Sequence, residues 1–166
     1  MDCNLEPILD DMLSSIPIGA SPEAIDTWQR LGPLTVAHFK QKKLAAVDVT
    51  GQTTLYTEWR SPLGDQCFGQ VKRLEGELVT FIRDGIVRRI DSGSVSEAQY
   101  AADKLHGYLR VIKADGSYQT SEYKDNLLDG PCRYYKSGGV LWIEHLFKEG
   151  EIVERRTDPV EQSEQP

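Results

Sequence analysis

The histidines are the residues of this chain best suited to acid–base chemistry, because an imidazole titrates near neutral pH. There are three: His38 in VAHFK, His106 in LHG, and His145 beside Glu144 in IEHLF. Neighbouring residues of a strand point to opposite faces, so the Glu144–His145 pair is a weak catalytic signal. The sequence has no HExxH, nucleophile elbow or Walker loop, and DSGSVSE is not followed by the GK[ST] of a phosphate loop. We therefore expect a protein that is not an enzyme and uses no cofactor or metal.

The cysteines do not have the spacing of a metal or redox motif. Cys3, Cys67 and Cys132 are odd in number, far apart and without a CxxC pair. This pattern predicts reduced thiols with packing roles, as in a protein of a reducing compartment.

Composition and charge limit the kinds of partner. The 166 residues, 39% of them hydrophobic and 27% charged, suit one soluble domain with a core. A net charge of -7 argues against nucleic acid and anionic membranes as main partners, and is compatible with a basic protein. No apolar run reaches the roughly 18 residues of a membrane span. The opening stretch MDCNLEPILDDMLSS carries acids where a signal peptide carries Lys or Arg, so we expect a cytoplasmic protein.

Residues 1–33 are predicted to form helices that pack against the rest of the chain. Five apolar residues fall at helical spacing and would form one stripe: Leu5, Ile8, Leu9, Met12 and Leu13. Pro17 and Gly19 then interrupt the pattern.

A second helix is expected after this break. Ser21 is a good N-cap, and Pro22 suits the first helical position. Gly32 and Pro33 would end the helix. The residues expected to face inward are Ile25, Trp28 and Leu31.

From residue 34 the apolar period changes to two, which predicts short strands joined by glycine turns. The first strand candidates are LTVAHF, LAAVDVTGQTTLYTEW and GELVTFIRDGIVRRI. Residues 91–107 are more polar and interrupt this pattern. Within them, residues 94–103 are expected to form one or two helical turns capped by Ser94 or Ser96. Residues 157–166 lack apolar content and are expected to be a disordered tail.

Three segments later in the chain align with one another: LEGELVTFIRDG (74–85), LHGYLRVIKADG (105–116) and LDGPCRYYKSGG (128–139). Each begins Leu-x-Gly, carries an apolar or aromatic pair followed by a basic residue, and ends on Gly. The repeating unit is a strand, a glycine turn, a second strand and a polar turn that leads to the next Leu-x-Gly. A degenerate earlier copy is suggested by VDVTGQTTLYTEW, with Gly51 at its turn.

The glycines explain the regularity of this pattern. Hairpin turns of the primed types need positive φ, which glycine adopts readily, and Asp-Gly in RDGI and ADGS is a strong hairpin signal. One hairpin is too small to be stable alone, so neighbouring hairpins must pair into a continuous antiparallel meander.

This pattern resembles the MORN repeat family, and in particular its bacterial variant assigned to antitoxin components. The best match is LDGPCRYYKSGGVLWIEHLFKEGEIVE, followed by LHGYLRVIKADGSYQTSEYKD and LEGELVTFIRDGIVRR. The resemblance covers roughly residues 74–153. The chain departs from the family pattern in having Tyr-Tyr only once, in separating its first two copies more widely than its last two, and in having no repeat counterpart for residues 1–33.

The resemblance implies a non-enzymatic, protein-binding sheet. We therefore expect an α+β fold in which N-terminal helices precede an antiparallel β-meander of MORN-like hairpin repeats. The expected parts are a helical segment (1–33), the sheet (34–156) with repeats at 74–92, 105–127 and 128–153, and the tail (157–166).

The function that the resemblance implies is that of an immunity protein or antitoxin, which would cover the active site of a basic toxin domain. Aromatic anchors near carboxylates suit interface hot spots. The contact residues expected on this basis are Tyr118, Glu122, Tyr134, Trp142 and Glu144. Core or cross-strand packing is the alternative role for these aromatics. The alternative function is that of a chaperone or adaptor for a secreted effector, binding through the acidic N-terminal helices.

Overall fold

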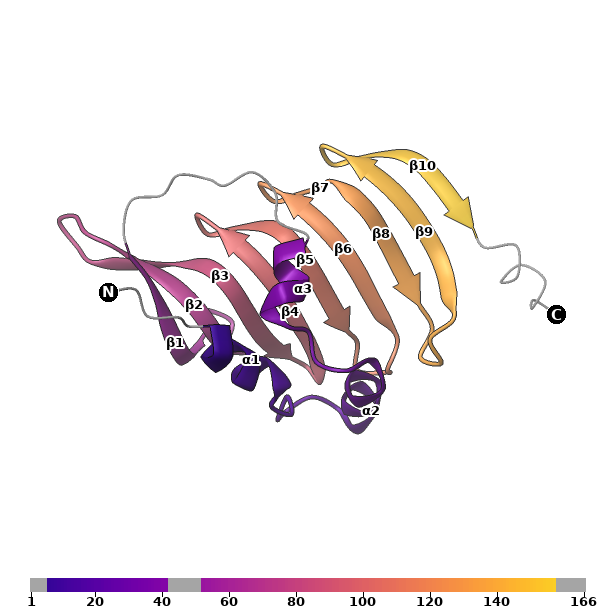
Figure 1. The fold of residues 1–166 in the computed structure, drawn as a ribbon, viewed down its shortest axis with the longest axis horizontal. Coiled ribbons are helices and arrows are strands. Elements are labelled where there is room, and N and C mark those ends of the chain that lie inside the picture. The colour runs from indigo at the N-terminus through magenta and orange to yellow at the C-terminus, as the bar shows by residue number, and fades with distance from the viewer. Residues whose placement is uncertain (1–5, 42–51, 158–166) are drawn as a thin grey trace.

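A computed structural model describes residues 6–41 and 52–157 of the chain (Figure 1). These residues form three helices and one ten-stranded sheet. The helices are α1 (Glu6–Ser14), α2 (Pro22–Leu31) and α3 (Val36–Gln41). The strands are β1 (Gln52–Arg60), β2 (Gln66–Leu74), β3 (Thr80–Asp91), β4 (Ser94–Ala101), β5 (Lys104–Ile112), β6 (Tyr118–Lys124), β7 (Leu127–Leu128), β8 (Gly130–Tyr135), β9 (Leu141–Lys148) and β10 (Glu151–Thr157). The predictions for Cys3, Leu5, the turn at Gly51 and the tail from 158 onward lie outside the described residues.

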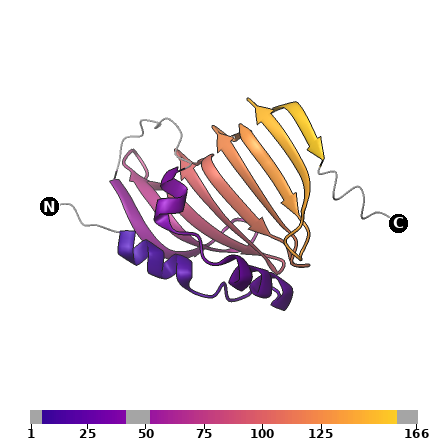
Figure 2. The ribbon, with the colours of Figure 1, turned by 45° about the vertical axis from the view of Figure 1, so that its right-hand side comes forward.

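The sheet is an antiparallel meander, as predicted. The strands pair in the order β1-β2-β3-β4-β5-β6-β8-β9-β10, and the short β7 pairs with β6. Figure 1 accordingly shows the colours passing in order from magenta to yellow across the sheet. α1 and α3 lie in front of the earlier strands and α2 lies at the lower edge of the sheet, and no described helix lies in front of β8, β9 or β10 (Figures 1 and 2).

The prediction of a strand at LTVAHF is wrong, because this segment contains α3. The Thr35 hydroxyl accepts a hydrogen bond from the His38 amide at 3.1 Å, which caps the start of the helix. Val36 and Phe39, one helical turn apart, are both buried and pack with Leu9 of α1. The apolar alternation in LTVAHF is too short to distinguish the period of a strand from the period of a helix.

The predicted hairpin at Arg83-Asp84-Gly85 is also wrong, since β3 runs straight through it. Gly85 has a φ of 115°, but it lies in a bulge, where the pairing of β3 with β2 shifts register. The turn falls instead at Ser92 and Gly93, which both have positive φ. Residues 94–101 therefore form β4 and not helical turns. By contrast, the Asp-Gly turn predicted at Asp115 and Gly116 is confirmed between β5 and β6.

The structure thus shifts the first repeat copy down the chain, so that Gly85 and not Gly76 is its first glycine. In this frame the repeated glycine lies inside a strand, and its occurrences fall at nearly equal intervals: Gly85, Gly107 and Gly130. Each lies directly opposite an aromatic residue of the next long strand, in the pairs Gly85–Tyr100, Gly107–Tyr123 and Gly130–Phe147. When the first copy is counted from Gly85 and not from Gly76, the three copies are nearly equally spaced.

Two clusters of buried apolar residues attach the helices to the sheet. In the first, Ala24 and Trp28 of α2 pack on Ile90, Ile112 and Tyr118. In the second, α1 and α3 pack on Ile86, with Leu9, Leu13 and Phe39 as the main helical residues. Trp28 faces inward as predicted, and Ile25 is partly buried. Leu31 is 39% exposed, so its predicted inward orientation is wrong, and Ile8 of the predicted apolar stripe is 44% exposed.

The start of α2 is fixed by hydrogen bonds to the repeat turns. The Ser21 hydroxyl accepts from the Ala24 amide at 3.0 Å, which confirms the predicted N-cap. The same hydroxyl donates to the Ala114 carbonyl at 2.6 Å, and Thr27 donates to the Gly116 carbonyl at 2.7 Å. The helix therefore lies along the edge of the sheet where the turns are found.

A buried triad of charged side chains lies between the helices and the sheet. Glu97 accepts from Arg88 at 2.9 Å and from Arg110 at 3.1 Å, and each of the three residues is at most 5% exposed. Arg88 also donates to the carbonyls of Leu13 and Ser15 at the end of α1, at 2.8 and 2.9 Å. Arg110 donates to the Gly32 carbonyl at the end of α2, at 3.1 Å. The buried triad thus binds the carboxyl ends of both helices.

We predict that Glu97→Gln lowers the free energy of unfolding by about 3–5 kcal/mol, because it leaves two buried arginines without a charged partner. Urea unfolding followed by tryptophan fluorescence measures this change. The control is Glu75→Gln, since the Arg73–Glu75 pair is mostly exposed and its loss should leave stability nearly unchanged. Equal effects of the two substitutions would show that the buried triad does not hold the helices.

We predict that Gly107→Ala lowers the free energy of unfolding by about 1–3 kcal/mol. Gly107 has a φ of 124°, and a Cβ there would lie 2.3 Å from Oε1 of Gln99. Gly138→Ala is the matched control, because a Cβ at Gly138 meets nothing within 4 Å and needs no positive φ. Thermal unfolding of both variants distinguishes them, and a Gly107→Ala protein as stable as Gly138→Ala would contradict the role of the bulge.

Candidate functional site

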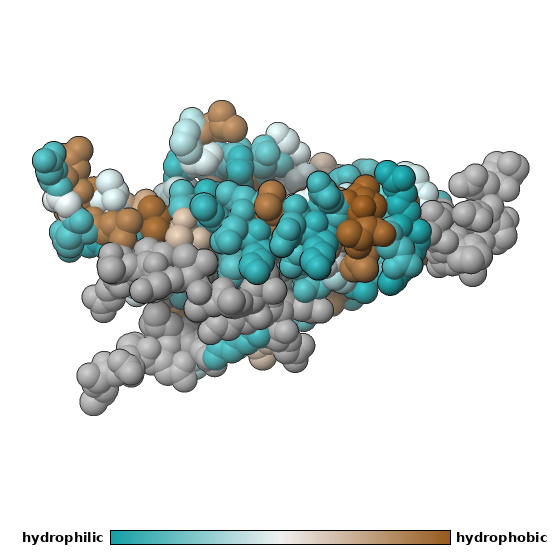
Figure 3. Space-filling view, turned by 90° about the horizontal axis from the view of Figure 1, so that it is seen from above, coloured by the Kyte–Doolittle hydropathy of each residue, from teal (hydrophilic) through white to brown (hydrophobic). Residues whose placement is uncertain are grey.

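Two surfaces of the described residues are candidates for binding. Alternate residues of each strand point to opposite faces of the sheet. We call the face that carries α1–α3 the helix face and the other the far face. Figure 3 shows hydrophobic groups in separate patches, at the left-hand tip and over the right-hand strands, with hydrophilic surface between them. Exposed apolar residues at these two ends include Leu78 and Phe81 near the β2–β3 hairpin, and Ile152 and Val153 on β10.

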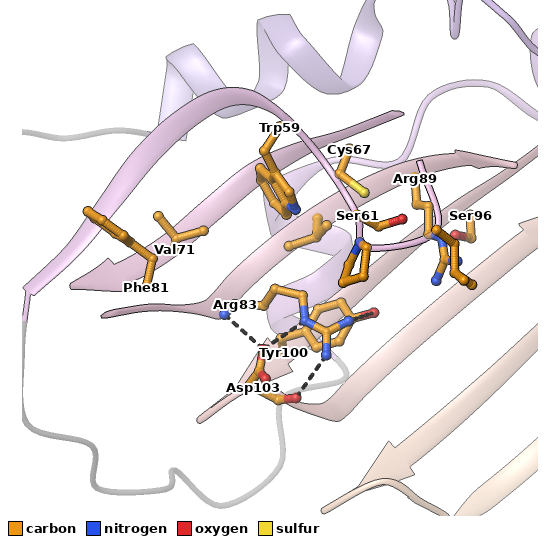
Figure 4. Close-up of a pocket in the computed structure, with 13 residues that line it drawn as sticks. Trp59, Ser61, Cys67, Val71, Phe81, Arg83, Arg89, Ser96, Tyr100 and Asp103 are labelled. Carbon is orange, nitrogen blue, oxygen red and sulfur yellow. Dashed lines mark hydrogen bonds and ion pairs between the residues drawn. The ribbon is translucent and has the colours of Figure 1, made fainter. Parts of the chain in front are cut away.

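The first candidate is a cavity of about 660 Å³ on the far face, over β1–β4 (Figure 4). Its apolar wall is formed by Trp59, Pro62, Leu63, Val71, Phe81 and Val87. This size and lining are typical of sites that bind an apolar group with a few oriented polar contacts.

Two arginines supply the polar contacts of this cavity. Arg83 donates to the Asp103 carboxylate at 2.7 Å and to the Tyr100 hydroxyl at 3.2 Å, and its guanidinium carbon lies 4.3 Å from the centroid of the Tyr100 ring (Figure 4). Arg89 donates to Asp65 at 2.8 Å. Because both guanidinium groups are held by carboxylates, their positive charges are fixed in place beside the apolar wall.

Cys67 also lines the cavity. Burial raises the pKa of its thiol, and the sulfur donates weakly to the Asp65 carbonyl at 3.7 Å. At neutral pH the group is therefore a thiol, which packs well and is a poor nucleophile.

The second candidate is the uncovered end of the helix face. A row of residues lies directly opposite one another on successive strands: Arg88, Glu97, Arg110, Thr120, Arg133, Glu144 and Arg156. Its first three members are the buried triad. Its last three, which we call the exposed triad, lie on β8–β10, where Figures 1 and 2 show no helix.

In the exposed triad a glutamate again lies between two arginines. Glu144 accepts from Arg133, and its other oxygen lies 3.3 Å from Arg156, which also donates to Glu154 at 2.8 Å. The arginine side chains are 38% and 50% exposed and that of Glu144 is 15% exposed. The hydrogen bond from Arg133, with a further one from Arg156, lowers the pKa of Glu144.

Aromatic residues adjoin the exposed triad at the turn edge of the sheet. Tyr118 and Tyr135 stack with ring centroids 4.5 Å apart. With Trp142, Lys113 and Lys136 they line a shallow hollow. Trp142 is 45% exposed and is the most accessible aromatic of this hollow.

The five residues predicted for partner contact do not form one patch. Tyr118, Glu122, Trp142 and Glu144 lie on the helix face, but Tyr118 is only 8% exposed and belongs to the core under α2. Tyr134 lies on the far face, with its ring 6.4 Å from that of His145. A hydrogen bond with Cys132, together with burial, raises the pKa of Tyr134 to about 12.

The sequence argument overlooked the arginines of the exposed triad. Arg88, Arg110 and Arg133 each follow a repeated glycine of positive φ by three positions, and Arg88 joins this series only when the first copy is aligned at Gly85. The expectation that Glu144 and His145 point to opposite faces agrees with the register, because Glu144 pairs with Arg133 and His145 with Cys132.

The histidines occupy separate places in the fold. His38 lies edge-on to Tyr108 at 4.6 Å, buried His106 lies 3.6 Å from Asp125, and His145 packs near Phe147. Among residues 6–41 and 52–157, no three or more His, Cys, Asp or Glu side chains are grouped to hold a metal ion. In the same residues, no helix has the length and apolar character needed to cross a membrane.

Comparisons with known proteins add no family assignment. No family model matches the chain, and a search of curated proteins gives no significant match. The resemblance to MORN repeats therefore stays a prediction from the sequence pattern, and the functional argument rests on the geometry of the surfaces.

We predict that Glu144→Gln lowers the free energy of unfolding by about 1 kcal/mol at pH 7, since its hydrogen-bonded arginines are partly exposed. The pKa of Glu144 lies below its ordinary 4.5 in the folded protein. Its contribution is therefore fully present above about pH 4.5 and is lost as the pH falls through the folded-state pKa. Urea unfolding of both proteins between pH 3 and pH 7 measures the difference, and a difference that grows as the pH falls would contradict this assignment.

Proposed function

We propose that the chain is a non-enzymatic protein-binding module that acts as an immunity protein or antitoxin, neutralising a cognate toxin by covering its active site. The observation that carries the proposal is the half-covered helix face. The charged row that holds the protein's own helices at one end continues across β8–β10 at the other, where no described helix lies. A row of this kind, beside an exposed Trp142, is a surface ready to receive another protein.

The rigidity of this surface supports steric occlusion. β9 pairs along its length with β8 and β10, and the exposed triad fixes side chains across these three strands. A preformed surface loses little conformational freedom on binding, which favours tight association. Exposed tryptophan and arginine are the residue types that most often dominate such interfaces.

The distribution of charge supports a partner with a basic face. The chain carries a net charge of -7, and Asp11, Glu23 and Asp26 are exposed on α1 and α2. An acidic protein approaches a basic toxin faster than a neutral one does. The same exposed acids favour the second candidate function, in which the chain is a chaperone or adaptor that holds a secreted effector through its helices.

We predict that the double variant Trp142→Ala/Glu144→Gln binds the toxin at least tenfold more weakly than the wild type does. Tagged wild type is used to capture proteins from the source cells, and each captured protein is then expressed alone and with the chain. The wild-type chain should restore growth of cells that express the toxin, and the double variant should restore it poorly. Calorimetry with the purified toxin measures the affinity.

Leu78→Ala serves as the control, since Leu78 is 80% exposed between β2 and β3, away from β8–β10, and does not line the first candidate cavity. It should bind like the wild type, and a melting curve checks that the double variant is folded. A captured protein that keeps its full activity in the complex would contradict occlusion and favour the chaperone or adaptor function.

A further inference from the structure

We propose that the exposed triad receives the carboxyl end of an α-helix from the partner protein. This inference rests on the proposed function for the existence of a partner, and it names the kind of structure that the partner presents. The occupant is a helix that lies across the uncovered strands with its last carbonyl groups over Arg133 and Arg156.

The protein already contains two examples of this contact. Arg88 donates to the carbonyls of Leu13 and Ser15 at the end of α1, at 2.8 and 2.9 Å. Arg110 donates to the carbonyl of Gly32 at the end of α2, at 3.1 Å. The last carbonyls of a helix have no partner within the helix and carry about half a negative charge, so a guanidinium group suits them.

The exposed triad repeats this arrangement one step further along the sheet. Arg133 follows Gly130 by three positions, as Arg110 follows Gly107 and Arg88 follows Gly85. Glu144 lies between Arg133 and Arg156 in the way that Glu97 lies between Arg88 and Arg110. α1 and α2 end on the first two arginines of this series, and no described helix lies over the third.

The surface beside the exposed triad suits the body of such a helix. α2 lies along the turns and reaches the third repeat through Arg30, which donates to the Ser137 carbonyl at 2.7 Å. Beyond that point, Tyr135 and Trp142 present an aromatic surface, and Val140 is 39% exposed. A second helix placed beyond α2 would cover these residues with its apolar side, as Trp28 of α2 covers Ile112.

The charges around the exposed triad favour a helix end over a fully charged anion. Glu144 lies between the two arginines, and Glu154 accepts from Arg156 at 2.8 Å, so two guanidinium groups already face two carboxylates. A phosphate or carboxylate placed over both arginines would lie against the Glu144 carboxylate and be repelled. Helix carbonyls accept the remaining N–H groups while adding only a partial charge.

A synthetic helix tests this inference without the natural partner. The probe is a peptide that copies residues 21–33, held helical by a lactam bridge and amidated so that it has no terminal carboxylate. It is titrated into the full ¹⁵N-labelled chain. We expect saturable shifts of the Arg133 Nε–H and Trp142 Nε1–H resonances, with Arg110 unchanged because its helix end is already occupied.

Matched variants and a matched peptide make the test specific. Arg133→Gln should raise the Kd at least tenfold, and Trp142→Ala at least fivefold. Arg155→Gln, the neighbouring arginine of β10 on the far face, should change the Kd by less than twofold. A peptide of the same net charge in which Ile25→Pro breaks the helix should bind at least tenfold more weakly.

Each other outcome overturns the inference. Absence of shifts at Arg133, an equal response to the proline peptide, or equal effects of Arg133→Gln and Arg155→Gln would exclude recognition of a helix end. A dimer of the chain alone that Arg133→Gln dissociates would make a second copy the occupant. If the chain still neutralises a toxin after any of these results, the proposed function stands without the helix-end site. If the peptide binds as expected but no toxin is found, the helix-end site stands and the proposed toxin neutralisation is rejected.

Discussion

Glu97 lies between Arg88 and Arg110, and all three side chains are almost fully shielded from water. The need to pair these buried charges constrains how the helices pack on the sheet. Charges removed from water must be paired and fully hydrogen-bonded. Both arginines pair with Glu97 and also donate to the carbonyls that end α1 and α2, which leaves only the buried Nε of Arg110 without a hydrogen-bond partner in this triad. Together with the two apolar clusters, these contacts hold α1 and α2 against the strands that carry the buried triad.

The sheet beneath depends on a second recurring arrangement. A glycine of positive φ in a strand allows a bulge, and an aromatic residue of the next long strand lies opposite it. A bulge increases the local twist of a sheet. The pairing shifts register beside Gly85 and beside Gly107, while the charged row stays directly paired from β3 to β10.

Features set by local interactions could be predicted from the sequence, and those set by distant contacts could not. The Ser21 cap and the turn at Gly116 depend on neighbouring residues, and both are confirmed. Gly85 follows Asp just as Gly116 does, yet it lies within a strand. There the Gln70 side chain accepts from the Ile86 amide at 2.9 Å, and the bulge replaces a turn. For the proposed binding surface, the sequence indicated Trp142 and Glu144, but the pairing of Glu144 with Arg133 and Arg156 requires the strand register.

The meander is also modular. Each long strand of the meander pairs only with the strands beside it, so a duplication of the last unit, which begins at Gly130, would add two more strands at the end away from α1 and α3. Two strands add about 10 Å to the width of a sheet. The distance between the anchored helices and the uncovered end could thus change in steps during evolution, which would let related chains fit targets of different breadth on one unchanged core.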